Sequence, residues 1–472
     1  MSPASSSLAW HAAPGDPEDV QGPTSHRIVV YPPHRPMASA GEKLFVCALV
    51  LAACARREPP PDAARPPAGS VVLHAPAAPS YSTAHGSTAR SGRVAAMPAT
   101  YAPLARRPRG WPADFPSPSV GEWGKKTDPR FVLVSPGARR VVVDWGHTYD
   151  LRDADGNFVD ARDDEGRRFV WIPDGLMVDD DQLITKDYVL SFSSDGHLRV
   201  RSGCTGGSVL VEHVDADRCL AVVVNPGHPH GGGESLQIES GGLHDPQSAQ
   251  PGVPLAVFRE HIPIAAVMDS DGAVVFTSFW YDVSPAQAGL TVVPRVDRHW
   301  SVPLPRDWLR TDGLSLIPPY VALVGVAPGT SADRGRVLHV LDTSGRELWS
   351  VESPFDVAQP AIDCAGRICL AGDGLAATEG GRVVWSRFVG ERVRATAFDD
   401  GSLAVAQRGE LHVVSRDGAD RQTLPVAEGE TITTPPAIAH DGSIWVATAQ
   451  AVYVARPQTA QSSRDAAVDG SR

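Results

Sequence analysis

Histidines near the middle of the chain are the residues best suited by type to bind a metal ion. His228 and His230 are separated by one proline and followed by three glycines and Glu234. Imidazole is a common ligand of zinc and copper, and flexible glycines let two rings converge on one ion. The spacing matches no established metal site, however. The sequence therefore favours a solvent-exposed loop at His228 and His230, and we expect no resident metal or other cofactor.

The common catalytic signatures are also missing from the sequence. It contains no G-x-S-x-G and no H-E-x-x-H. The lysines at 125 and 126 do not follow a glycine-rich turn as the lysine of a phosphate loop does, and the loose G-x-G-x-x-A at 372–377 is followed by turn residues instead of a helix. We therefore expect no enzyme.

The six cysteines suggest an oxidising compartment. Cys204 with Cys219 and Cys364 with Cys369 are locally spaced pairs, and both could close as disulfides outside the cytoplasm. Cys364 and Cys369 flank Ala365-Gly366, where a hairpin turn would bring them opposite each other. Four buried free thiols are the alternative.

Residues 44–53 form a ten-residue apolar run after Lys43, too short to span a bilayer but typical of a signal-peptide core. The run ends in Leu-Ala-Ala-Cys54, which resembles the lipobox of bacterial lipoproteins. That resemblance implies a diacylglycerol anchor with palmitate-type chains on Cys54, and Ala55 resembles the signal for the outer membrane. A buried apolar strand containing a cysteine is the alternative.

Composition divides the rest of the chain. Residues 1–36 are rich in proline and acidic residues, which predicts a non-native extension and translation from Met37, with a signal peptide at 37–53. Residues 54–109 lack periodicity and are rich in Pro, Ala, Ser and Arg, which predicts a disordered tether. Residues 457–472 have the same character. The folded part is therefore expected at 110–456.

Charge excludes one class of partner. The chain has 43 Lys and Arg against 55 Asp and Glu, a net charge of −12, with no basic stripe. Binding of a polyanion by counterion release needs the opposite balance, so we expect no nucleic-acid partner.

Turn-forming pairs recur along the predicted folded part. Each is followed by a short alternating apolar run, as in strand-turn-strand units. We call each of these turn-forming pairs a turn mark. With one turn mark missing near residue 234 and one insertion near 327–331, the turn marks recur about every 40 residues. This predicts an all-β propeller of seven or eight blades, with a sandwich pair or a β-helix as the alternative. Its closing strand could come from 131–134 or 141–143. The marks end at the glycines Gly156, Gly196, Gly272, Gly313, Gly366, Gly401 and Gly442.

The segment Leu341–Trp349 resembles the repeat of pyrroloquinoline-quinone-type propellers, in which a strand ends in Leu-Asp, turns through Thr-x-Gly and re-enters with Trp. The same register returns at Gly381–Trp385. The resemblance implies that Trp349 and Trp385 pack against neighbouring blades. It does not extend to the quinone, because the dehydrogenases of this type carry a vicinal cysteine pair that the sequence lacks.

These patterns together predict a monomeric, lipid-anchored propeller of the outer membrane, facing the periplasm or the cell surface. It would present a propeller face to an envelope protein or polymer as a binding or scaffold protein. One alternative is a polysaccharide lyase or hydrolase that uses the channel, with channel-facing His339, His412 and His440 as candidates. A purely structural surface lipoprotein is another.

Overall fold

The computed structural model describes residues 97–458, with gaps. Contacts divide the chain into two units, Met1–Pro61 and Asp62–Arg472, and every described residue belongs to the second. Among the described residues, no helix is long and apolar enough to cross a membrane. The gaps are 111–127, 136, 146–148, 161–174, 178–179, 186–187, 194–196, 203–207, 215–217, 226–234, 243–252, 260, 269–272, 281–286, 296–297, 311–312 and 327–334.

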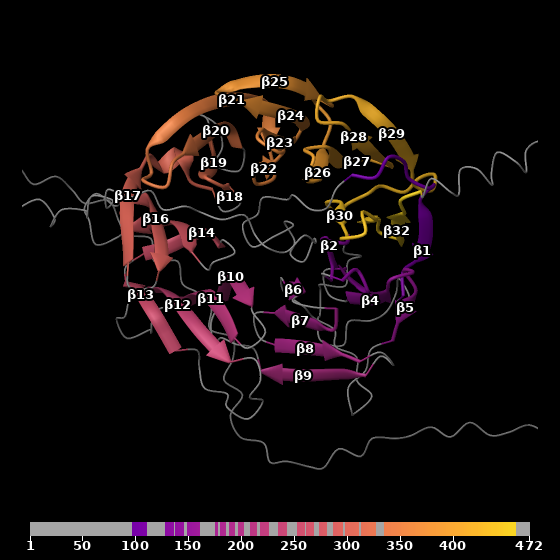
Figure 1. The fold of residues 1–472 in the computed structure, drawn as a ribbon, viewed down its shortest axis with the longest axis horizontal. Helices are drawn as coiled ribbons and strands as arrows, with labels where there is room; N and C mark the ends of the chain where they lie inside the picture. The colour runs from indigo at the N-terminus through magenta and orange to yellow at the C-terminus, as the bar shows by residue number, and fades with distance from the viewer. Residues whose placement is uncertain are drawn as a thin grey trace, which may run out of the picture. The chain divides into compact units, whose positions relative to one another are not determined.

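The described strands form antiparallel groups of four, and in all groups but the last they follow one another in chain order (Figure 1). Short β-branched runs between turn residues suit such hairpin-linked strands. The first three groups comprise β2 (Phe131–Val134), β3 (Arg140–Asp144), β4 (Tyr149–Asp153) and β5 (Phe158–Val159); β6 (Gly175–Met177), β7 (Gln182–Thr185), β8 (Tyr188–Phe192) and β9 (Leu198–Ser202); and β10 (Ser208–Val214), β11 (Arg218–Asn225), β12 (Ser235–Gly242) and β13 (Val253–Arg259).

The next groups have the same form, and a short helix η1 (Arg306–Trp308) lies between two of them. One is β14 (His261–Met268), β15 (Val274–Trp280), β16 (Gln287–Arg295) and β17 (Arg298–Leu304). An eight-stranded sheet joins two more, β18 (Leu314–Ile317), β19 (Tyr320–Val326), β20 (Gly335–Leu341) and β21 (Glu347–Val357) with β22 (Ile362–Asp363), β23 (Ile368–Gly372), β24 (Gly374–Glu379) and β25 (Arg382–Arg387). Then come β26 (Val393–Ala397), β27 (Leu403–Gln407), β28 (Glu410–Val414) and β29 (Asp420–Pro425).

The last group combines both ends of the described chain. Strands β30 (Ala437–Ile438), β31 (Ile444–Ala447) and β32 (Ala451–Ala455) take their fourth strand from β1 (Ala105–Pro108). First strands of successive groups contact one another from β10 through β14, β18 and β22 to β26, and β2 contacts both β6 and β30. The first strands therefore form the inner side of the arrangement.

The fold is a β-propeller. Four-stranded antiparallel sheets, adjacent inner strands and a last sheet completed by the N-terminal strand define this architecture. The all-β prediction is confirmed. The described strands make eight groups of four, and the blade number of seven or eight stays a prediction.

The closing strand is not where the sequence suggested. Residues 131–134 and 141–143 are the first two strands of the β2–β5 group, and β1 closes the last sheet. This strand lies inside the predicted tether 54–109, so the folded part begins earlier than residue 110. The sequence hides it because Ala-Arg-Arg-Pro has no β-branched residue. Pro108 is tolerated because β1 lies at the edge of its sheet.

The turn marks lie at three kinds of position in the groups, although the spacing was counted as if they were equivalent. Gly156 lies between the third and fourth strands of its group, whereas Gly366, Gly401 and Gly442 lie between first and second strands. Gly313 precedes a first strand. Part of the long interval between Gly313 and Gly366 therefore comes from comparing different positions in the group.

Hydrophobic clusters fill the spaces between consecutive groups. One contains Leu151 and Leu190 from the first two groups, and another contains Phe398 and Ile444 on the two sides of a later boundary. The cluster at the closing seam joins Val132 of β2 to strands β31 and β32. The core is therefore divided among blade interfaces, as propeller packing requires.

A buried ion pair fixes the segment after β1. Arg152 and Asp150, whose side chains are 1% and 0% exposed, are joined by a 2.6 Å contact between Nη2 and Oδ2. Arg152 Nη2 also donates to the Pro108 carbonyl at 2.7 Å, and the Gly110 amide donates to Asp150 Oδ2 at 2.9 Å. The pair thus ties the end of the closing strand to β4 of the next group.

We expect Arg152→Met to lower the free energy of unfolding by about 3–5 kcal/mol, because it leaves the Asp150 carboxylate buried without its cation. Denaturant unfolding followed by tryptophan fluorescence measures the change. The control is Arg421→Met, at an exposed position on β29, which should change stability by less than about 0.5 kcal/mol. Equal effects of the two substitutions would contradict the role of the pair.

Candidate functional site

Tryptophans on fourth strands fasten three of the described groups to the group that follows. Trp385 on β25 donates its indole N–H to the Arg416 carbonyl at 3.0 Å, in the turn between β28 and β29. Trp300 on β17 makes the equivalent bond to the Thr343 carbonyl at 3.1 Å. Trp349 on β21 packs beside Gly381, in the β24–β25 turn. Trp349 and Trp385, which the sequence singled out, and Trp300, which it missed, thus all contact the following group.

The turns that receive these tryptophans are closely fitted. Gly418 has a φ of +89°, and a Cβ atom on it would lie 2.9 Å from the Trp385 ring. Both the backbone conformation and the space therefore require glycine. The Ser415 amide donates to the Ala419 carbonyl at 2.8 Å, and Asp342 and Arg346 are bonded in the same way at 3.0 Å. These two turns are equivalent in their groups.

Gln422 occupies the tryptophan position on β29. It is four residues after Gly418, as Trp385 is four residues after Gly381. Its amide accepts from the Tyr101 N–H at 2.9 Å and donates to the Tyr101 carbonyl at 2.8 Å. The Tyr101 hydroxyl donates to the Gly442 carbonyl at 3.0 Å. At this boundary, the N-terminal segment therefore takes the place of the tryptophan contact.

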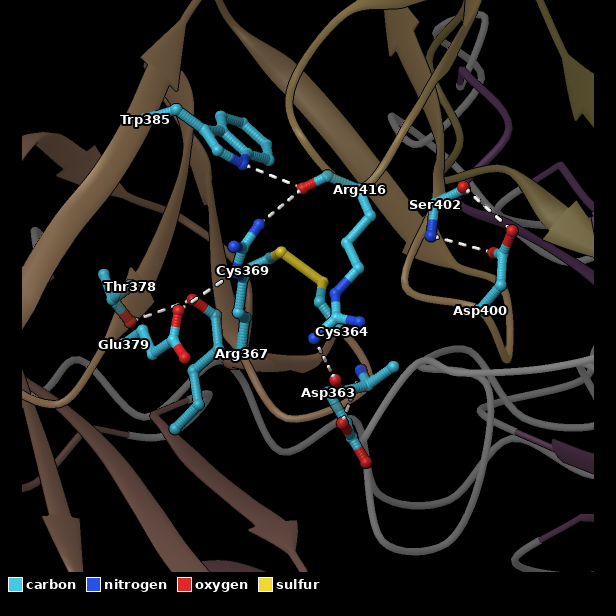
Figure 2. The surroundings of a disulfide bond; sticks show 12 residues. Asp363, Cys364, Arg367, Cys369, Thr378, Glu379, Trp385, Asp400, Ser402 and Arg416 are labelled. Carbon is cyan, nitrogen blue, oxygen red and sulfur yellow. Dashed lines mark hydrogen bonds and ion pairs between the residues drawn. A yellow bond between two sulfur atoms is a disulfide. The ribbon is translucent and has the colours of Figure 1, made fainter.

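Cys364 and Cys369 are joined by a disulfide bond across the β22–β23 hairpin (Figure 2). Both are 1% exposed and belong to the cluster between the β22–β25 and β26–β29 groups. Ala365 and Gly366 between them both have positive φ values, 54° and 91°. The bond therefore braces a tight turn at a blade boundary.

Two arginines link this hairpin to the next group. Arg367 Nη1 donates to the Arg416 carbonyl at 3.0 Å, and Arg416 Nη2 donates to the Ala365 carbonyl at 2.8 Å. Figure 2 shows the Arg416 carbonyl shared by Arg367 and Trp385. We call the end of the propeller formed by the first-to-second and third-to-fourth turns the disulfide end.

Replacing both cysteines by serine should lower the free energy of unfolding by about 2 kcal/mol, through the loss of a short covalent loop. Thermal unfolding of the double variant Cys364→Ser/Cys369→Ser checks this. The matched measurement is the native protein with a reductant, which should lose stability by a similar amount. A native protein that is insensitive to reduction, with free thiols found by alkylation and mass measurement, would contradict the bridge.

His339 and His412 occupy equivalent positions, each three residues before the turn that follows its strand. They lie on β20 and β28, which are third strands and not the inner ones. The expectation that they face the channel is therefore wrong. His440 is exposed, in the turn between β30 and β31.

Each buried histidine meets an aromatic ring and an acid. His339 stacks on Trp308 with ring centroids 3.8 Å apart, and its Nδ1 lies 2.9 Å from Glu347 Oε1. The His412 ring is 5.1 Å from the ring of Phe388, and Asp420 Oδ1 lies 3.9 Å from its Nδ1. Trp308 and Phe388 both follow the fourth strand of the preceding group. The histidines thus belong to blade contacts.

Burial lowers the pKa of His339 below its ordinary value, although Glu347 and Asp307 act in the opposite direction. The unfolded chain therefore binds this proton at higher pH than the folded one. The stabilisation is present above a pH of about 6.5 and is lost as the pH falls below it.

His339→Gln should accordingly weaken the fall in melting temperature between about pH 7.5 and 5.5. Calorimetric scans across this range measure the slope. The same series on His440→Gln, at the exposed turn, is the matched control. An unchanged slope for His339→Gln would contradict the prediction.

The opposite end of the propeller carries an exposed apolar residue among charges. Val389, in the connection from β25 to β26, is 56% exposed. Nearby in the chain, Arg392 Nη1 lies 3.3 Å from Asp373 Oδ1 in the β23–β24 turn. Glu391 Oε2 lies 3.7 Å from Nε of Arg408. We call this connection, with the β23–β24 and β27–β28 turns, the Val389 end.

Arg394 is a further charged residue that sequence reasoning missed. It is partly buried on β26, a first strand whose other residues are apolar or small. A single charged residue inside a short apolar strand was the available signal.

Several predicted site residues lie outside the described residues. These include Cys54 with its signal segment, the metal candidates His228 and His230, and Cys204, whose proposed partner Cys219 is on β11. Within the described ranges, no group of three or more His, Cys, Asp or Glu residues could hold a metal ion.

No protein-family model and no curated protein sequence matches this chain. Solved structures resemble it at low similarity. BamB from Moraxella catarrhalis is 12% identical, with 76% of this chain and 100% of that chain covered and a TM-score of 0.39. A streptogramin B lyase has 10% identity, 75% and 97% coverage and a TM-score of 0.37. The WD40 propeller domain of Doa1 is 11% identical, with 60% of this chain and 92% of that chain covered and a TM-score of 0.35. At these values the comparisons carry no argument, and the fold is assigned from strand pairing.

Proposed function

We propose that this protein is a lipid-anchored, non-enzymatic propeller of the bacterial cell envelope that binds a protein partner through its Val389 end. The observation that carries the proposal is the exposure of Val389. It is 56% exposed, more than the other large apolar residues found exposed among the described ones, Tyr320, Leu348 and Val384, at 39% each. An apolar centre with a polar rim is the usual anatomy of a protein-binding surface.

The rest of the molecule supplies a rigid frame for this surface. Tryptophan contacts and the buried ion pair fix one group against the next, and the disulfide braces a turn at a blade boundary. Connections held on a rigid scaffold are where propeller folds commonly bind their partners. His339 and His412, the residues best suited to acid-base chemistry, have side chains occupied in blade contacts. This supports binding in preference to catalysis.

The envelope address rests on the sequence before the propeller. The apolar run at 44–53 and the lipobox ending in Cys54 support a lipid anchor, and Ala55 supports the outer membrane. The segment between Cys54 and Met97 is long enough to separate the propeller from a membrane surface.

We expect Cys54→Ala to abolish lipid attachment and to move the protein out of the membrane fraction. Intact-mass measurement and fractionation of the producing bacterium check this. Cys47→Ala is the matched control, because Cys47 leaves with the signal peptide and its loss should leave lipid and sedimentation unchanged. Finding the native protein unprocessed and soluble would refute the proposed location in the cell envelope.

Partner binding is tested by placing a photocrosslinking residue at Val389 in producing cells. A discrete crosslinked band is expected there and not from Val384, an exposed apolar position on the outer strand β25. Equal labelling at both positions, or none at Val389, would contradict binding through this end.

A further inference from the structure

Arg394 differs from its arginine neighbours at the Val389 end. Arg392 is paired with Asp373, and Arg408 is paired with Glu391. No described residue accepts a hydrogen bond from the Arg394 guanidinium or forms an ion pair with it. One cation of this cluster therefore has no acceptor among the residues that the structure describes.

The fold fixes the position of this cation. Val393 and Ala395 on β26 belong to the cluster shared with the β22–β25 group. Because side chains alternate along a strand, Arg394 shares the other face with Thr396, whose hydroxyl donates to the Pro436 carbonyl at 2.6 Å. Arg394 is next to the first residue of this inner strand, at the end away from the Gly401 turn. It therefore lies on the inner side, at the Val389 end.

The Arg394 side chain is partly buried, and its guanidinium carries five N–H donors, which suit an anion placed beside them. Burial lowers the pKa of Arg394, the charge of Arg392 lowers it further, and Asp128 is the acid that acts to raise it. The local charges thus leave a site that an incoming anion would stabilise.

We infer that Arg394 is an anion-binding residue that receives a carboxylate of the bound partner. The planar guanidinium fork matches a carboxylate with two parallel hydrogen bonds. Arg392, two residues earlier, adds positive charge beside it. The inference rests on the proposed binding function only in assigning the carboxylate to a partner, and it does not depend on the lipid anchor.

Ligand-detected NMR titration of the full chain with N-acetylglycine tests the site at constant ionic strength. Arg394→Met should weaken binding about tenfold or more, because it removes the charged donors. Arg382→Met, at an exposed position on β25, is the matched control and should leave binding unchanged. N-acetylglycinamide, which lacks the carboxylate, should not bind. Competition by inorganic phosphate would show that the site accepts other oxyanions.

A structural role for Arg394 predicts a different result. If its side chain holds the fold together, Arg394→Met lowers the melting temperature; a binding residue without a partner predicts an unchanged or higher one. Arg394→Lys keeps the charge without the fork and should restore part of the binding. The inference is overturned if N-acetylglycine does not bind, if Arg394→Met binds it normally, or if Arg382→Met weakens it equally. Loss of the Val389 crosslink with normal probe binding would refute only the partner surface.

Discussion

Pairing between β1 and β32 is the constraint on which the rest of the structure depends. A propeller blade buries its faces only against its neighbours, so the first and last groups stay exposed unless the chain ends meet. Four residue pairs, from Ala105 with Val454 to Pro108 with Ala451, make that junction. Tyr101, Gln422 and the Asp150–Arg152 pair reinforce it from both sides. Hydrophobic packing across the seam then joins the last group to the first.

The same physical problem is solved at the other boundaries by a different set of side chains. A flat indole placed on a fourth strand reaches the glycine-containing turn of the next group and satisfies one of its carbonyls. Where the fourth strand has no tryptophan, Gln422 or an arginine makes the hydrogen bond to the neighbouring segment instead. Arg107, for example, donates to the Asp155 carbonyl at 3.0 Å. The propeller thus preserves a geometric position while the chemistry at that position varies.

This variation explains how much the sequence could predict. Strands between glycine turns, and Trp349 and Trp385 in register after Gly345 and Gly381, were sufficient for the fold class. Trp300 escaped because Val296 stands where those segments have glycine, and β1 escaped because its pairing comes from β32 and not from its own residues. His339 and His412 were recognised as candidates but misplaced. Each lies three residues before the first residue of a turn, Asp342 or Ser415, that joins the third strand of a group to the fourth. That spacing would have placed both histidines on third strands.

The closing strand β1 is synthesised long before the strand with which it pairs. Tyr101 and the Gly442 carbonyl that it bonds are 341 residues apart, so β1 leaves the ribosome long before its partner exists. Contacts this distant in sequence form slowly, because a long loop must close before any of them is made. Until then the edges of β1 and of the growing blades are unpaired and open to aggregation. A protein built this way depends on protection of its nascent chain until the last strand arrives.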